Sequence, residues 1–427
     1  MFGWGVELIA SPRLRECDSG ALLVRLVYRK YVCELGQSVN LDVTLGAKAA
    51  AAAAAHASDP RIAFVRGLCA AAESLLQQFR EAALATLAAL RTDAGVPSSL
   101  ADAAEVGPLL HGLLRSLRYC LLSLPASEMA AAPGWDAAAA APWRGLYDAA
   151  GQLLSDAFSL CVRVISEDED TRAAAAVAAS GVGGDVLSKG RIDCRGHLIT
   201  EAGDEDAEDD DHLLARCAWL IVKEVATGYG LLVSDVPMEP DDPGSERWVL
   251  ARSFVRDFGH GMVAALLRMQ HFGAVKHTGV ALGVVSSRLL QLDSARTALR
   301  ALPGGWLDSL LGQITTSEFI LRRSAGYGLA IQVIVASEPH NVAPCLLQRA
   351  MSCLLAHAGA TDGARDVVRA RVHALNVMRL MFWDSQLARD VPPYVHRALE
   401  IAFLGFHAPM WAVRNSSMML FTAVVTR

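Results

Sequence analysis

A short pattern recurs along the C-terminal half of the chain and restricts the fold more than any other feature. An apolar residue, usually followed by a basic one, precedes a small residue two or three positions later. Copies begin at Val275, Leu321 and Val413, with a weaker copy at Val372, so successive copies lie 46, 51 and 41 positions apart. HEAT and armadillo repeats have periods of about 40–47 residues, and small residues let neighbouring helices approach closely. The intervals predict an all-α, HEAT/armadillo-like α-solenoid of stacked helical hairpins.

The composition also favours helices over sheet. Of the 427 residues, 53% are hydrophobic and only 6% are aromatic, and Ala and Leu, both strong helix formers, are abundant. The run Ala49–Ala55 is compatible with a helix or with a low-complexity linker. The apolar patterning predicts helices at 20–36, 60–92, 106–123, 143–165, 212–233, 247–270, 273–290, 304–314, 317–337, 342–357, 364–383, 391–406 and 409–426.

The distribution of acidic residues predicts three segments. N-terminal helical repeats occupy 1–165, an acidic, Gly-containing disordered linker occupies 166–211, and a second helical-repeat domain occupies 212–427. Glu201–Asp211 contains eight acids in eleven residues, and such a stretch buries too little apolar surface to offset its ordering entropy. A metal-binding acidic loop is the alternative interpretation, although the ligand spacing of a calcium loop is absent.

Charge and cysteine usage narrow the class of protein. The net charge of −6 divides into −14 for residues 1–250 and +8 for residues 251–427. The basic residues are 34 Arg and 5 Lys, which fits phosphate recognition and equally fits a GC-rich genome. Nine cysteines without C-x-x-C spacing predict reduced thiols and no zinc site. Leu213–Val233 comes closest to a membrane span, but charged residues interrupt it, so we expect a soluble protein without membrane or metal.

Motifs for catalysis are absent from the sequence. Neither a Walker pattern nor H-E-x-x-H nor G-x-S-x-G occurs, and the glycines at 181, 183 and 184 follow no predicted strand. Glu224 is interpreted as a paired structural charge rather than a catalytic one, because buried charges usually pair. His271 is interpreted first as a satisfied core histidine. Arg414 and Asn415 are compatible with a hydrogen-bond ladder between repeats or with a phosphate contact.

The adjacent arginines Arg322 and Arg323 are the strongest nucleic-acid candidates from the sequence alone. Side chains of neighbouring helical residues point about 100° apart, so one guanidinium can serve repeat packing while the other faces solvent. An outward-facing guanidinium is suited to phosphate contacts that position a protein on nucleic acid.

Several motifs together resemble the thyroid adenoma-associated protein (THADA) family. The strongest are Arg322-Arg323-Ser324-Ala325-Gly326, His373-Ala374-Leu375-Asn376 and Trp411–Ser417, which occur in this order. Upstream signatures are Trp219 with Lys223-Glu224, and His271-Phe272-Gly273-Ala274. Fainter similarities are Tyr28–Val32, Leu35-Gly36, His111-Gly112 and Arg118-Tyr119. The chain departs from the family pattern at Gln270, Lys276 and Tyr327-Gly328.

The resemblance implies a helical, non-catalytic subunit of a tRNA ribose methyltransferase. An FtsJ-type partner would bind S-adenosylmethionine and methylate the 2′-oxygen of anticodon-loop nucleotide 32, so this chain would need no cofactor. Its implied partners are tRNA and that methyltransferase, and its implied location is the cytoplasm. The resemblance ties Arg322 and Arg323 most directly to function. The full set of candidate tRNA-binding residues is Arg322, Arg323, Arg414, Asn415, His271 and Lys223.

Two alternatives remain beside this interpretation. A HEAT-repeat adaptor that binds only proteins would explain the same helices, and the acidic N-terminal block would suit a basic partner. An intrinsic enzyme is the more distant alternative. Members of the family are also far longer than 427 residues, so the chain is expected to be a fragment, a truncated gene product or a short form.

Overall fold

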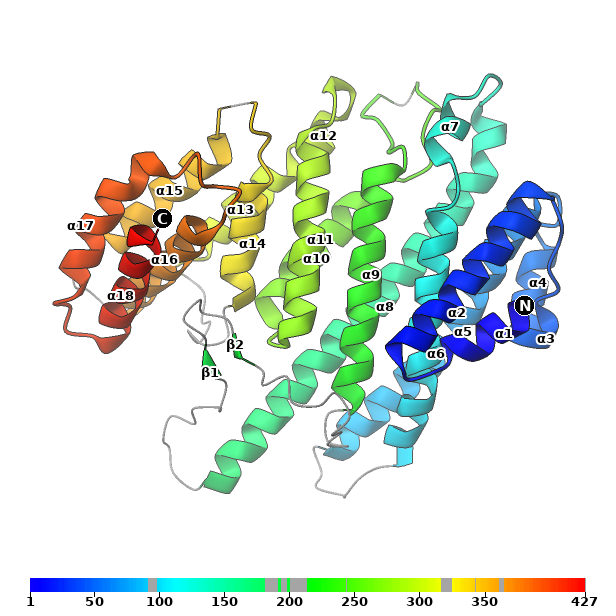
Figure 1. Cartoon of the computed structure of the whole chain (residues 1–427), viewed down its shortest axis with the longest axis horizontal. Helices are drawn as coiled ribbons and strands as arrows, with labels where there is room; N and C mark the ends of the chain where they lie inside the picture. The colour runs from blue at the N-terminus through cyan, green and yellow to red at the C-terminus, as the bar shows by residue number, and fades with distance from the viewer. Residues whose placement is uncertain are drawn as a thin grey trace. The chain divides into compact units, whose positions relative to one another are not determined.

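A computed structural model describes most of the chain (Figure 1). The described residues are 1–90, 98–180, 191–192, 198–199, 213–242, 244–315, 325–341, 343–360 and 365–426. Nearly all of the regular structure among these residues is helical. The exceptions are a two-residue antiparallel pairing of β1 (Arg191–Ile192) with β2 (Leu198–Ile199) and an isolated bridge between Met238 and Leu250. The prediction of an all-α protein is therefore confirmed.

Packing between helices divides the chain into two units. Unit 1 comprises Met1–Met238, Glu246–Ala251 and His271–Ala274. Unit 2 comprises Glu239–Ser245, Arg252–Gln270 and Val275–Arg427. Each unit has its own buried core, and the two are described separately.

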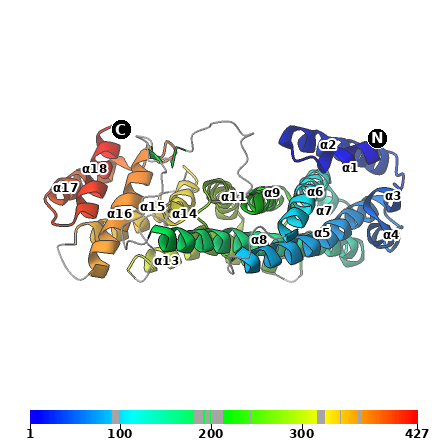
Figure 2. The same cartoon turned by 90° about the horizontal axis from the view of Figure 1, so that it is seen from below.

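Unit 1 is built on four long helices that pack against one another. The elements are α1 (Phe2–Ile9), α2 (Leu14–Val27), the π-helix η1 (Tyr28–Glu34), α3 (Asp42–Leu45), α4 (Ala47–Ala54), α5 (Pro60–Leu90), α6 (Ser98–Leu121), α7 (Ala126–Ala131), α8 (Ala137–Ser180) and α9 (Leu213–Asp235). Helix α6 packs on α5 and α9, and α8 packs on the same two helices. Helices α1 and α2 form an outer layer over α6 (Figure 2).

Helix α9 is the central apolar helix of unit 1. Among the described residues it alone is long and apolar enough to cross a membrane, and 72% of its most apolar window is buried inside the protein. Its buried side chains include Ile221, Val222 and Val225, which are fully shielded from solvent. Burial against the other helices of unit 1 therefore explains why α9 is so apolar.

Unit 2 consists of helices joined mainly by short loops. They are α10 (Arg252–Arg268), α11 (Phe272–Leu290, whose first three residues belong to unit 1), η3 (Ser294–Arg296), α12 (Thr297–Arg300), α13 (Leu302–Gly312), α14 (Ala325–Ala336), α15 (Cys345–Ala358), α16 (Arg365–Trp383), η4 (Pro392–Tyr394), α17 (Val395–Gly405) and α18 (Trp411–Val425). Helix α16 packs against α14, α15 and α18, and α17 packs on α18.

Small residues set the close approach of helices in unit 2. A Cβ on Gly279 of α11 would lie 2.5 Å from Leu329 of α14, and a Cβ on Gly328 of α14 would lie 2.8 Å from Leu380 of α16. The two contacts join α11 to α14 and α14 to α16, and the residues in each contact lie about 50 positions apart, close to the predicted repeat. The expectation that small residues allow tight helix packing is confirmed here.

The predicted helices agree with the structure over most of their lengths, with some corrections. The helix predicted from 247 begins at Arg252, because the backbone N–H groups of Val249 and Leu250 both donate to the Pro237 carbonyl at 3.0 Å. The alanine run is helical, as α4, and the short helices α1, α3 and α7 were not predicted.

The predicted linker is only partly covered by the described residues. Helix α8 extends to Ser180, beyond position 166 where the linker was predicted to begin. Residues 181–190, 193–197 and 200–212 lie outside the described residues, so the disorder of this segment remains a prediction.

Candidate functional site

The structure describes four of the six candidate tRNA-binding residues. Lys223 and His271 belong to unit 1, whereas Arg414 and Asn415 belong to unit 2. Arg322 and Arg323 lie outside the described residues, and their role remains a prediction.

Lys223 and His271 both approach the indole of Trp219. Trp219 lies one turn before Lys223 on α9, and the Lys223 ammonium is 5.9 Å from the centre of the Trp219 ring. The His271 imidazole stacks on that ring with centroids 5.3 Å apart and an interplanar angle of 22°. A cation within about 6 Å of an indole is attracted by its π-electrons. Two separate signatures of the sequence therefore form one cluster, which is partly exposed.

His271 also caps the N-terminus of α11. The Ala274 backbone N–H donates to Nδ1 of His271 at 3.3 Å, which satisfies one of the free N–H groups at the helix start. His271 is half-buried rather than part of the core. The hydrogen bond to Nδ1 agrees with the interpretation of His271 as a structural histidine with its hydrogen bonds made. A tRNA contact by this half-buried side chain stays a prediction.

The structure explains why glycine stands at position 273, within the signature that contains His271. A Cβ on Gly273 would lie 3.1 Å from the Trp219 ring and 3.2 Å from the His271 ring. These distances are tighter than ordinary van der Waals contacts, so a side chain there would push against the stacked pair. Gly273 is needed for close packing of the cluster.

The Arg414 guanidinium forms hydrogen bonds with the loop that precedes α18. Its Nη1 donates to the carbonyl oxygens of Ala408 at 2.9 Å and Pro409 at 2.8 Å. Both hydrogen bonds are therefore within the hairpin of α17 and α18, rather than to another repeat. Asn415 is exposed, and its amide lies 3.8 Å from the Met419 sulfur. Both side chains remain accessible, and a phosphate contact by either one stays a prediction.

Gly326, the last residue of the Arg-Arg-Ser-Ala-Gly motif, has a packing role in unit 2. It lies in the first turn of α14, against the backbone of Leu266 in α10. A Cβ at this position would lie 2.8 Å from the Leu266 carbonyl carbon and still closer to its oxygen. Backbone cannot move aside as a flexible side chain does, so this position requires glycine.

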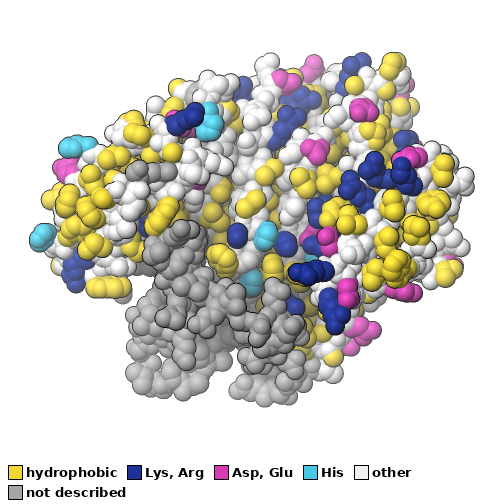
Figure 3. All heavy atoms as spheres, in the orientation of Figure 1, with side chains coloured by type: hydrophobic (Ala, Val, Ile, Leu, Met, Phe, Trp, Pro, Cys, Tyr) yellow, Lys and Arg dark blue, Asp and Glu magenta, His cyan; other side chains and the backbone are white. Residues whose placement is uncertain are grey.

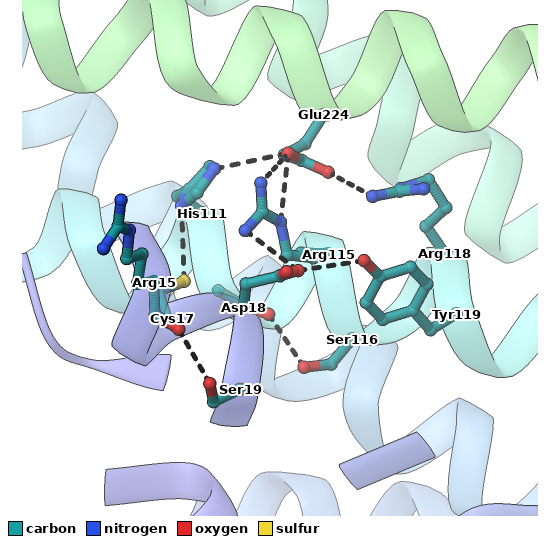
Figure 4. Close-up of polar contacts among 11 residues, drawn as sticks. Arg15, Cys17, Asp18, Ser19, His111, Arg115, Ser116, Arg118, Tyr119 and Glu224 are labelled. Atoms are coloured by element: carbon teal, nitrogen blue, oxygen red, sulfur yellow. Dashed lines mark hydrogen bonds and ion pairs between the residues drawn. The ribbon is translucent and has the colours of Figure 1, made fainter. Parts of the chain in front are cut away.

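A buried polar network joins three helices of unit 1 around Glu224 (Figure 4). Glu224 on α9 is 3% exposed. Arg115 on α6 donates to Oε1 through Nη2 at 2.6 Å and through Nε at 3.1 Å. Arg118, also on α6, donates to Oε2 at 2.9 Å. The interpretation of Glu224 as a paired structural charge is confirmed.

The network continues from α6 to α2. Arg115 Nη1 donates to Oδ1 of Asp18 at 3.2 Å, and the Tyr119 hydroxyl donates to the same oxygen at 2.9 Å. The Arg118 guanidinium lies 4.5 Å from the centre of the Tyr119 ring. Arg115 thereby connects acids from two different helices and joins both α2 and α9 to α6.

Burial and neighbouring charges act in opposite directions on Glu224. Burial alone would raise the pKa of the carboxyl group, but the polar groups of His111 and Arg115 and the charge of Arg118 outweigh it. The pKa of Glu224 therefore lies well below its ordinary value, and the carboxylate stays ionised at neutral pH. The pKa of Arg115 is raised because its bonds to Glu224 overcome the effect of burial.

Cys17, His111 and Glu224 lie in series but are not suited to nucleophilic catalysis. The Cys17 sulfur is 3.6 Å from His111 Nδ1, and His111 Nε2 is 3.6 Å from Glu224 Oε1. Cys17 is only 1% exposed, and burial raises the pKa of its thiol to about 11. A reactive cysteine needs an accessible thiolate, so this arrangement serves packing.

Metal ligands do not gather within the described parts of the chain. Among those residues, no group of three His, Cys, Asp or Glu side chains is placed to hold a metal ion. The eight cysteines in this set are free thiols, and Cys194 lies outside it.

Sequence reasoning missed Arg115 and Asp18 as members of the network. A local signal for one half of it existed, since His111, Arg115 and Arg118 lie at helical spacings of four and three along an otherwise apolar segment. Their acidic partners lie about 100 positions away on other helices, and no local pattern indicates which acids pair with them.

Fold and polar clusters together define an all-helical protein of paired, closely packed helices. A family model described as THADA/TRM732, DUF2428 matches residues 146–412. The chain belongs to the THADA/TRM732 family.

Curated relatives from animals and yeast carry one functional name. The human protein named tRNA (32-2′-O)-methyltransferase regulator THADA is 39% identical over 219 residues, which are 49% of this chain and 11% of the human protein. A Drosophila melanogaster relative of the same name is 27% identical over 362 residues, or 77% of this chain and 19% of the relative. The Schizosaccharomyces pombe regulator trm732 is 27% identical over 175 residues, 40% of this chain and 12% of its own length. The chain thus spans between about a tenth and a fifth of these relatives.

Proposed function

We propose that this chain is a non-catalytic regulatory element for 2′-O-ribose methylation of nucleotide 32 in the tRNA anticodon loop. The observation that carries the proposal is membership of the THADA/TRM732 family, whose curated relatives are named as regulators of that methyltransferase. An FtsJ-type partner in the cytoplasm binds S-adenosylmethionine and performs the chemistry. This chain positions tRNA, and correct positioning of a reacting hydroxyl accelerates a reaction without any chemical group from the scaffold.

The helix pairs are proposed to form a HEAT/armadillo-type solenoid. Support comes from the glycine contacts that join α11 to α14 and α14 to α16 at similar sequence intervals. A solenoid presents an extended surface, and tRNA is recognised mainly by shape and by its phosphate backbone. The proposed contact residues are Lys223 and His271 in unit 1, and Arg322, Arg323, Arg414 and Asn415 in unit 2.

A salt titration of tRNA binding tests the RNA contact directly. Binding through phosphate contacts weakens steeply as salt increases, by about 0.7–0.9 in log–log slope per phosphate neutralised. We expect Arg322→Glu with Arg323→Glu to lower the affinity for tRNA and to reduce the slope. Arg349→Glu is a matched control, because Arg349 is an exposed arginine engaged with Asp308 at 2.9 Å and outside the proposed contacts. Salt-independent binding, or equal effects of both variants, would contradict the proposal.

A protein-only adaptor is the second candidate function. Exposed apolar side chains at both ends of the chain favour it, among them Leu22 and Leu26 on α2 and Trp411 on α18. Purified chain that binds the methyltransferase but shows no salt-dependent affinity for tRNA would support the adaptor. The two candidates are therefore separated by the same titration.

A further inference from the structure

Helix α2 and the first turn of the π-helix η1 that continues it expose a stripe of apolar and basic side chains. Arg15, Leu22 and Leu26 on α2 and Arg29 on η1 follow one another at intervals of seven, four and three residues, which places them on one side of the continuous helix. Leu22 and Leu26 are each 44% exposed, and both arginines are exposed. Figure 3 shows hydrophobic side chains beside Lys and Arg side chains over the part of unit 1 that α1 and α2 cover. We call Arg15, Leu22, Leu26 and Arg29 the α2 stripe.

The arginines of the α2 stripe are not neutralised by acids within the described residues. Nearby acids are already engaged, since Glu16 pairs with Arg13 at 3.0 Å and Glu34 pairs with Lys30 at 2.8 Å. Figure 4 shows the Arg15 guanidinium lying outside the network around Glu224. The stripe therefore offers two leucines between two uncompensated positive charges.

The opposite face of α2 is closely packed against α1 and α6. Cys17, Ala21 and Val24 are buried beneath it. A Cβ on Gly20 would lie 2.7 Å from the backbone of α1, and Asp18 accepts bonds from α6. A surface on a fixed helix loses little entropy on binding, so exposed side chains there are well suited to a protein contact.

We propose that the α2 stripe docks an amphipathic helix of the methyltransferase partner, with aliphatic residues in the centre and acidic residues toward both ends. The two arginines are 14 residues apart, and at about 1.5 Å per residue the acids must lie roughly 20 Å apart. Leucines at i and i+4 fit the apolar face of such a helix. Leucine side chains offer nothing to a phosphate backbone, which favours a protein over RNA as the occupant. This inference rests on the proposed function and assigns its partner-binding surface.

Affinity measurements on the full chain test the inference, with the purified FtsJ-type methyltransferase of the same organism and unmodified tRNA as probes. One double variant is Leu22→Asp with Leu26→Asp, and the other is Arg15→Glu with Arg29→Glu. The matched control is Val280→Asp with Val284→Asp, a second exposed apolar pair at the same spacing on α11, outside the stripe. All substituted residues are exposed, and circular dichroism with thermal melting verifies folding.

We expect both α2-stripe variants to weaken methyltransferase binding by at least about tenfold, as loss of interface anchors does. The control and the affinity for tRNA should stay within about twofold of wild type.

Each other outcome overturns the inference in a different way. Unchanged methyltransferase affinity in both stripe variants removes the α2 stripe from the interface and leaves the proposed function standing. A selective loss of tRNA affinity makes the stripe an RNA surface. A smaller oligomer for the leucine variant, with unchanged partner affinity, assigns the stripe to self-association. Absence of methyltransferase binding by the wild-type chain defeats the proposed function itself, and this inference with it.

Discussion

Replacement of Glu224 by Gln should destabilise unit 1 strongly. The substitution keeps the shape of the side chain but removes the charge that pairs with Arg115 and Arg118. It also turns an acceptor into an amide donor facing guanidinium donors. Removing one partner of a buried ion pair costs about 3–5 kcal/mol, against a total stability of about 5–15 kcal/mol for a typical domain. In a unit of this size each kcal/mol of lost stability lowers Tm by about 2–4 °C, so we expect a Tm decrease of roughly 10 °C.

Differential scanning calorimetry and urea unfolding followed by circular dichroism measure this loss. The matched control is Glu34→Gln, since Glu34 pairs with Lys30 at 2.8 Å while both side chains are half exposed. An exposed pair of this kind contributes about 0.5 kcal/mol or less, so the control should melt within about 2 °C of wild type. If Glu224→Gln melted like the control, the network would contribute little, and its role in fixing α2 and α9 on α6 would be refuted.

Three further predictions concern pH and glycine packing. The pKa of Glu224 is lower in the folded state, so the stabilisation by its carboxylate is complete above the ordinary pKa of 4.5 and is lost as the pH falls below that value. Between pH 7 and pH 3 the free energy of unfolding, measured in urea, should therefore decrease more for wild type than for Glu224→Gln. Gly273→Ala should lose about 1–2 kcal/mol through contact with the stacked rings. Gly326→Ala should lose about 1–3 kcal/mol or more against the α10 backbone. Gly261→Ala is the control for both, because its Cβ meets nothing within 4 Å and alanine should stabilise that helix by up to about 1 kcal/mol in chemical denaturation. Equal behaviour of the three glycine variants would contradict the packing argument.

The sequence predicts the helices well because their signals are local. Apolar periodicity and proline-marked loops locate α5, α9, α11 and α16 to within two residues, whereas α6 begins eight residues and α8 six residues before the predicted start. The predicted start of α10 is wrong because the backbone N–H groups of Val249 and Leu250 donate to the Pro237 carbonyl. No local pattern reveals those hydrogen bonds. The short helices α1, α3 and α7 escaped prediction because four to eight residues carry too little periodicity.

The sequence singles out Lys223 and His271 as candidates but does not reveal their arrangement around Trp219. The signatures containing Lys223 and His271 stand about 50 positions apart in the sequence, and only the fold shows that both contact Trp219. The small residues of the repeat predict tight helix packing. Only the fold shows that Gly326 is required because it packs against the Leu266 backbone on another helix. Contacts between distant segments depend on tertiary packing, which the pattern of one segment does not encode.

Ribose methylation mapped at single-nucleotide resolution tests the proposed function most directly. In cells that lack the gene, 2′-O-methylation of tRNA nucleotide 32 should disappear while the methyltransferase protein remains present. Reintroduction of the wild-type gene should restore the modification. Undiminished methylation of nucleotide 32 in the deleted cells would contradict the assignment of this protein to that reaction.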